Sequence, residues 1–119
     1  MPEARWIDEG ATVSPDSILE TPCHVAHGAV VAAAAVVGAG SSVAADAHIE
    51  ERAQLRGAVV QERARVAEGA VVEAAVIGPR AQVGAGARIG AGAVVGPGVS
   101  ISPGAEIAEG ERVFPDGGR

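Results

Sequence analysis

"VGAGARIGAGAVVGPGVSISPGAEIAEG", residues 83–110, places a valine or isoleucine at every sixth position and is rich in glycine. Glycine in such a stretch either cradles a phosphate or shapes the backbone. A dinucleotide-binding fingerprint requires the spacing G-x-G-x-x-G, whereas Gly84, Gly86 and Gly90 are spaced G-x-G-x-x-x-G. A P-loop requires a lysine, and the chain contains none. We therefore interpret these glycines as turn residues.

The six-residue period extends along most of the chain. A frame that begins at Ile7 takes two five-residue steps, from Leu55 to Val60 and from Val72 to Ile77, and all nineteen frame positions are Ile, Leu or Val. The residue two positions before each is nearly always small. Side chains in a strand alternate between two faces, so both residues are expected to point inward. The period predicts short strands joined by tight corners, many of them at glycine.

This unit resembles the hexapeptide repeat of left-handed parallel β-helices. "VGAGAR" (83–88), "IGAGAV" (89–94) and "IEERAQ" (49–54) match it directly, and the resemblance covers about residues 7–113. It implies an all-β, single-stranded helix in which three units form one triangular coil. About six coils without inserted loops are expected, beginning at Ile7, Val25, Val43, Val60, Ile77 and Val95. Both five-residue steps then fall at the same corner of neighbouring coils, so the shortened corners should stack.

Composition favours a single domain over residues 1–119. The net charge of −6 argues against a nucleic-acid surface, and the hydrophobic residues, 48% of the chain, occur in short runs rather than in a membrane span. The first ten residues lack a signal-peptide core, so a cytoplasmic location is expected. Trp6 and Phe114 are the only aromatic residues and flank the frame, so we predict that they cap its ends.

Hexapeptide-repeat proteins include two enzyme classes with histidine-dependent sites. Acyltransferases of this type use a catalytic histidine and usually a projecting loop, and γ-class carbonic anhydrases bind zinc through three histidines shared between subunits. His24, His27 and His48 fall on different faces or levels of the expected helix. They should not converge within one chain, which leaves a site formed between subunits as an alternative. We expect no catalytic residue, metal or cofactor within the chain itself.

A third class resembles the chain more closely. "LRGAVVQERARVAEGAVV" (55–72) and "EAAVIGPRAQVGAGARIGAGAVV" (73–95) are similar to the C-terminal β-helix of sugar-nucleotide pyrophosphorylases. The catalytic nucleotidyltransferase domain of those enzymes, with its glycine-rich loop, has no counterpart in these residues. The resemblance therefore implies a scaffold or oligomerisation module, with a second copy or a nucleotidyltransferase domain as partner. An acyltransferase, or a γ-carbonic-anhydrase-like protein, remains the alternative.

Two columns of polar residues are expected across coils three to five. They are Asp46, Arg63 and Arg80 at the first corner, and His48, Arg65 and Gln82 on the strand that follows. The simpler interpretation is a solvated ladder, with an exposed Asp46–Arg63 pair that contributes at most about 1 kcal/mol. The alternative is an anion or sugar-phosphate site formed by Arg63 and Arg80 with Arg65 and His48.

A column of apolar residues is expected on the outside of one face. Val59, Val76 and Val94 each directly precede a frame residue, so they should point outward and stack about 4.8 Å apart in consecutive coils. Valine also suits any strand surface, and scattered exposed apolar residues are ordinary. An uninterrupted column is more typical of an interface, and we predict association through it.

Overall fold

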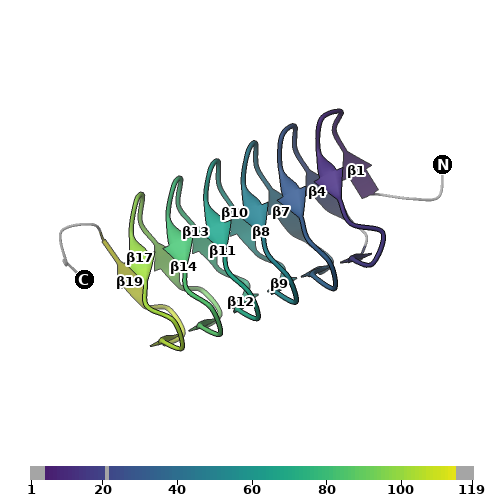
Figure 1. Ribbon diagram of the computed structural model, residues 1–119. Helices are drawn as coiled ribbons and strands as arrows, with labels where there is room; N and C mark the ends of the chain where they lie inside the picture. The colour runs from purple at the N-terminus through teal and green to yellow at the C-terminus, as the bar shows by residue number, and fades with distance from the viewer. Residues whose placement is uncertain (1–4, 21, 115–119) are drawn as a thin grey trace.

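The computed structural model describes residues 5–20 and 22–114, with side chains from Ile7 onward. These residues form nineteen short strands in three parallel sheets, and the chain winds through the sheets as a solenoid of about six turns (Figure 1). The solenoid measures 44 × 22 × 20 Å. Within these ranges no helix is long and apolar enough to cross a membrane. The prediction of an all-β coiled architecture is confirmed.

Each strand pairs with the strand one coil further along the chain. Sheet A contains β1 (Arg5–Ile7), β4 (Cys23–Val25), β7 (Ser41–Val43), β10 (Val59–Val60), β13 (Val76–Ile77), β16 (Val94–Val95) and β19 (Arg112–Val113). Sheet B contains β2 (Thr12–Val13), β5 (Val30–Val31), β8 (His48–Ile49), β11 (Arg65–Val66), β14 (Gln82–Val83) and β17 (Ser100–Ile101). Sheet C contains β3 (Ile18–Leu19), β6 (Val36–Val37), β9 (Gln54–Arg56), β12 (Val71–Glu73), β15 (Arg88–Ile89) and β18 (Glu106–Ile107).

The core is built from the six-residue frame. Every strand contains one frame residue, and the frame residues from Val25 to Val95 are at most 1% exposed. The small residues two positions earlier, such as Ala64 and Ala81, are equally buried. Large branched side chains therefore alternate with small ones, and together they form one continuous core cluster along the solenoid. The predicted frame and its inward orientation are confirmed.

The two shortened corners stack, as predicted. They connect β9 to β10 and β12 to β13, so both lead from sheet C to sheet A. Gly57 and Ala74 occupy them with φ values of 62° and 43°. A Cβ added at Gly57 would lie 3.9 Å from the Cα of Ala74, which is ordinary contact. Any difference in stability between glycine and alanine at this corner therefore comes from backbone conformation and not from steric crowding.

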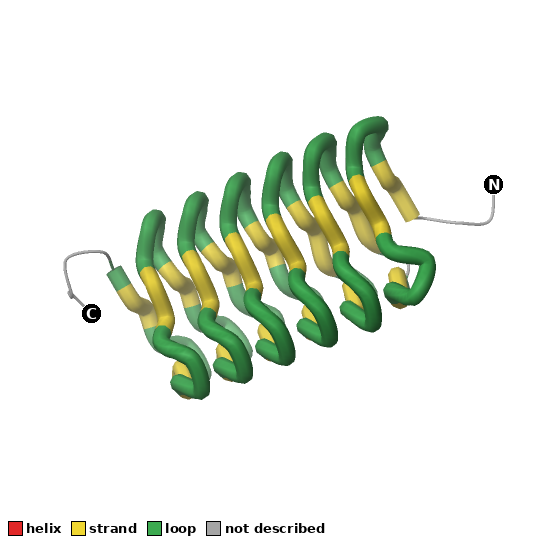
Figure 2. The backbone as a smooth tube through the Cα atoms, viewed as in Figure 1, coloured by secondary structure: helices red, strands yellow, loops and turns green. Residues whose placement is uncertain are grey.

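Corners also carry side chains at positive φ, which L-residues rarely adopt. Figure 2 shows the corners as short loops that lie above one another from coil to coil. Arg63 and Arg80 have φ values of 61° and 60°. Their backbone N–H groups donate to the carbonyl oxygens of Ala45 and Glu62 in the preceding coil, at 3.1 and 3.0 Å. These hydrogen bonds between coils help to hold the strained corners in place.

The two end coils have a stacked neighbour on one side only. Ile7 is 40% exposed, and the frame residues Leu19 and Val113 are only partly buried. Phe114 directly follows β19 and is 39% exposed. The Trp6 side chain lies outside the described part of the structure. Capping by these two aromatic residues stays a prediction.

Exchanging the residues at the shortened corners tests the strain argument. Gly57→Ala is expected to lower the free energy of unfolding by about 1 kcal/mol, because a Cβ is unfavourable in the left-handed region. Ala74→Gly is expected to raise the free energy of unfolding by up to about 1 kcal/mol, because it removes the same clash. Urea unfolding followed by circular dichroism measures both, and shifts in the same direction would contradict the argument.

Candidate functional site

An apolar stripe runs along the outside of sheet A. Val59 pairs in register with Val76, and Val76 pairs with Val94, so the three side chains stack in consecutive coils as predicted. Val59 is 37% exposed, and the other two are half-buried. Ser42 continues the column on one side and Arg112 on the other, so polar residues bound the stripe at both ends.

Buried glycines adjoin this stripe on two strands. Gly78 and Gly96 directly follow the frame residues of β13 and β16. A Cβ at Gly78 would lie 2.7 Å from the carbonyl oxygen of Val95 and 2.9 Å from the carbonyl carbon of Gly96. No side chain fits there, because the next coil approaches too closely. On β13 and β16 the outward side chains are therefore those of Val76 and Val94.

The outside of sheet B is polar and charged. His48 pairs in register with Arg65, Arg65 with Gln82, and Gln82 with Ser100, which confirms the predicted column and extends it by one coil. Arg63 lies two residues before Arg65, at the corner that leads into the sheet. The face therefore combines hydrogen-bond donors and acceptors over four consecutive coils.

Two ion pairs link coil three to coil four at this face. Arg65 Nε donates to Glu50 Oε2, and Arg52 Nη2 donates to Glu68 Oε2 at 2.6 Å. The hydrogen bond and the charge of Glu68 raise the pKa of the Arg52 guanidinium above its usual value. Sequence reasoning missed both pairs. The sequence does contain a signal for them. In each pair, residues of opposite charge lie 15 or 16 positions apart, which is close to the 17-residue length of this coil and therefore places them on neighbouring coils.

The expected Asp46–Arg63 pair is not formed. Asp46 turns toward the preceding coil, where a Cβ added at Gly28 would collide with its Oδ1 atom. Gly28 has no side chain, so it leaves room for the carboxylate above the corner. Within the described part of the chain, Arg63 and Arg80 make no ion pair. Both guanidinium groups are exposed.

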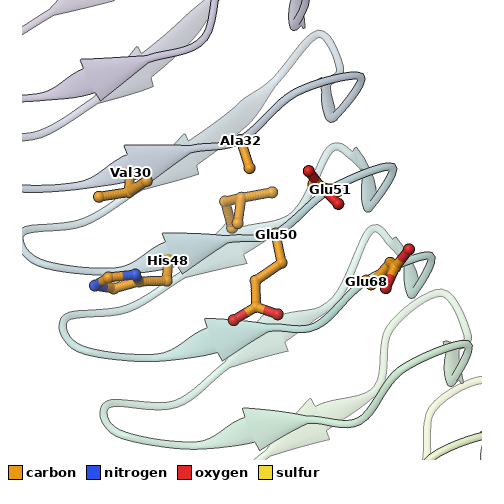
Figure 3. Close-up of a pocket in the computed structure, with 7 residues that line it drawn as sticks. Val30, Ala32, His48, Glu50, Glu51 and Glu68 are labelled. Carbon is orange, nitrogen blue, oxygen red and sulfur yellow. The ribbon is translucent and has the colours of Figure 1, made fainter.

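Two shallow hollows lie along sheet B, on either side of Glu50. The first has a volume of ≈ 240 Å³ and is lined by His48 and the carboxylates of Glu50, Glu51 and Glu68, with Val30 and Ala32. Figure 3 shows His48 beside Val30 on the neighbouring coil, with Glu51 and Glu68 at the corner beyond Glu50. His48 thus shares this hollow with three carboxylates, while Arg65 lies next to it in register on the neighbouring strand.

The second hollow is larger, with a volume of ≈ 510 Å³. Its polar lining consists of Glu50, Arg65, Gln82, Ser100 and Ser102. Glu50 is shared with the first hollow, whereas His48 and Arg65 line different hollows. The anion site predicted from Arg63, Arg80, Arg65 and His48 stays a prediction.

The three histidines lie apart. His24 is on β4 of sheet A, with Nε2 3.5 Å from Asp8 Oδ1. His27 lies at a corner, with Nδ1 2.6 Å from the carbonyl oxygen of Glu9. His48 lies on sheet B, and the described residues bring no three His, Cys, Asp or Glu side chains together as a metal-binding group. A metal site that uses one of these histidines would therefore need ligands from outside the described residues.

Comparison with known proteins identifies the type of solenoid. The model of the family described as GMPPB C-terminal domain matches residues 19–115. No curated protein matches the chain significantly in sequence. The acetyltransferase domain of PglB from Neisseria gonorrhoeae is similar in structure, with a TM-score of 0.87 and 27% identity over 92% of this chain and 54% of that chain. The solenoid is a left-handed β-helix, as the sequence resemblance implied.

More distant structures share the fold alone. A hexapeptide transferase family protein from Anaplasma phagocytophilum has a TM-score of 0.74 and 17% identity over 96% of this chain and 76% of that chain. PerB from Caulobacter crescentus, in complex with CoA and GDP-perosamine, has a TM-score of 0.63 and 20% identity over 93% of this chain and 55% of that chain. The chain thus spans about half the length of the Neisseria and Caulobacter structures.

A double-mutant cycle tests the Glu50–Arg65 ion pair. Glu50→Gln and Arg65→Gln are expected to show a coupling energy of about 0.2–1 kcal/mol, small because the pair is partly exposed to water. The coupling should fall as ionic strength rises. Arg88 and Glu106 provide a control, since they are in register on sheet C but are not among the ion pairs that the described residues form. Equal coupling in both cycles, measured by urea unfolding, would show that the Glu50–Arg65 contact adds nothing.

Proposed function

We propose that this chain, which belongs to the GMPPB C-terminal domain family, is a non-catalytic scaffold that holds an assembly together through sheet A. The observation that carries the proposal is the uninterrupted stripe of Val59, Val76 and Val94. The family is that of the C-terminal β-helix of sugar-nucleotide pyrophosphorylases, so the partner is a second copy or a nucleotidyltransferase domain. Self-association is the simpler arrangement, because it needs no other component.

The physical basis of this association is the burial of apolar surface. Each square ångström of apolar surface removed from water contributes about 25 cal/mol, and a contiguous column is buried more completely than scattered residues. Gly78 adds no side chain beside Val76, so no side chain at that position stands between Val76 and a partner. Ser42 and Arg112 supply a polar rim at the ends of the column, which is typical of interfaces between folded proteins.

The charged face supports a non-catalytic role for the isolated chain. The Glu50 carboxylate is held by Arg65, and the Glu68 carboxylate is held by Arg52. A general acid or base needs a proton-transfer group that reaches substrate, and these four groups are engaged with one another. We infer that they tie coil three to coil four rather than carry out chemistry.

Val76→Arg tests the interface. The side chain points outward, so the fold should survive, while a charge in the middle of the stripe should weaken association by at least tenfold. Val36→Arg is the matched control, because Val36 is a half-buried outward valine on sheet C. Sedimentation velocity across a concentration series measures the assembly state, and circular dichroism checks the fold. A wild type that stays monomeric at high micromolar concentration and binds no nucleotidyltransferase domain would refute the proposal.

An acetyltransferase with a site between subunits is the second candidate. Its support is the 27% identity to the Neisseria acetyltransferase domain, a structure of which contains acetyl coenzyme A. His48 is the histidine that lines a hollow, so it is the candidate general base.

This second candidate makes a separate prediction. Acetyl coenzyme A should bind the wild-type assembly with micromolar affinity, and transfer of the acetyl group to an amine acceptor should fall at least a hundredfold in His48→Asn, the typical contribution of a general base. His24→Asn is the control, since His24 lies on sheet A. Absence of acetyl coenzyme A binding, measured by calorimetry, would eliminate the enzyme and leave the scaffold.

A further inference from the structure

The larger hollow on sheet B lies over β11, β14 and β17, on a different face from the valine stripe. Its volume of ≈ 510 Å³ falls within the range of small-molecule sites. Ala67 and Gly84 lie in its floor. A Cβ at Gly84 would lie 2.5 Å from the backbone nitrogen of Pro103, so the packing of the next coil leaves no room for a side chain at this position.

Arg65 is oriented within this hollow but is only partly used. Its Nε atom donates to Glu50, which fixes the plane of the guanidinium group. The two Nη atoms have no recorded partner in the described part of the chain. A guanidinium fork held in this way presents parallel N–H donors, the arrangement that binds an oxyanion in a bidentate manner. The free edge of Arg65 therefore favours a ligand with a carboxylate or phosphate group.

Two further arginines lie at the corners that lead into the strands under the hollow, although they are not among its lining residues. Arg63 and Arg80 lie at the corner before β11 and β14, two residues before Arg65 and Gln82. They occupy equivalent positions in neighbouring coils, about 4.8 Å apart by strand spacing, so their like charges oppose each other. Asp46 turns toward Gly28 instead of neutralising them. Glu50 pairs with Arg65, whereas no described carboxylate forms an ion pair with Arg63 or Arg80, so two unpaired positive charges lie at these corners in a protein whose net charge is −6.

The rest of the lining suits hydroxyl groups. Gln82 offers an amide donor and acceptor, and Ser100 and Ser102 offer hydroxyls that both donate and accept. These side chains are exposed and have no recorded hydrogen bonds among the described residues. We propose that this hollow binds a small oxyanion that carries hydroxyl groups, with the oxyanion on Arg65 and the hydroxyls on Gln82, Ser100 and Ser102. Because Glu50 already pairs with Arg65 and offsets its charge, only about millimolar affinity is expected, highest at low ionic strength.

Titration of the ¹⁵N-labelled full chain at low salt tests the proposal. Glucuronate and glucose 6-phosphate provide the carboxylate and phosphate forms of the ligand, and glucose and inorganic phosphate provide each half alone. At least one of the first two should bind saturably, more tightly than either half, with amide shifts confined to β11, β14 and β17. Which of them binds more tightly identifies the oxyanion.

Variants separate this site from general electrostatics. Arg65→Gln should weaken binding on the order of tenfold, as expected for losing a charged hydrogen bond, and Gln82→Ala should weaken it less. Arg88→Gln is the matched control, because Arg88 holds the same position in the repeat on sheet C and should leave binding unchanged. Urea midpoints confirm that each variant folds. No saturable binding, or equal losses in Arg65→Gln and Arg88→Gln, would overturn the proposal. Val76→Arg should bind as the wild type does, which keeps this test independent of assembly.

Discussion

The stacking of each coil on the next in fixed parallel register is the constraint on which the rest of the structure depends. A six-residue unit is too short to bury its own side chains, so every branched residue of the frame is buried by the coils above and below. This explains why Ile77 and Val66 are fully buried in a chain with so little regular structure per unit. It also explains why the end coils, with one neighbour each, leave frame residues partly exposed.

Stacking also decides where the backbone can hold unusual conformations. Among the described residues, those other than glycine adopt positive φ only in coils two to five. They are Ala34, Asp46, Arg52, Arg63, Ala74 and Arg80. In coils one and six, positive φ occurs only at glycine, within the same described residues. An interior corner is held from both sides by hydrogen bonds and contacts with neighbouring coils, so its conformation is over-determined and tolerates strain.

The repeat made the fold predictable from the sequence. It did not make the directions of long, exposed side chains predictable. A strict period of six fixes which residues point inward, and two aligned five-residue steps fix the register of neighbouring coils. From these alone the column of Val59, Val76 and Val94 follows, as does that of His48, Arg65 and Gln82. The period says nothing of where an exposed carboxylate turns. Asp46 turned toward the space above Gly28, and Arg65 met Glu50, because local room and charge decide among rotamers that the backbone leaves open.

The same geometry lets one rod carry different chemistry on its faces. Each outward residue lies on the face of one sheet, and a corner separates that face from the face of the next sheet. A charge introduced on sheet A is therefore remote from the hollow on sheet B, apart from effects carried by the shared core. The core consists of nearly identical layers of Val, Ile and Ala. It requires that inward and outward positions alternate along each strand, but it does not determine which residue type occupies an outward position. The faces can diverge while the coils stay alike, so the fold that this chain shares with the Neisseria acetyltransferase domain does not by itself determine which chemistry, if any, a face carries.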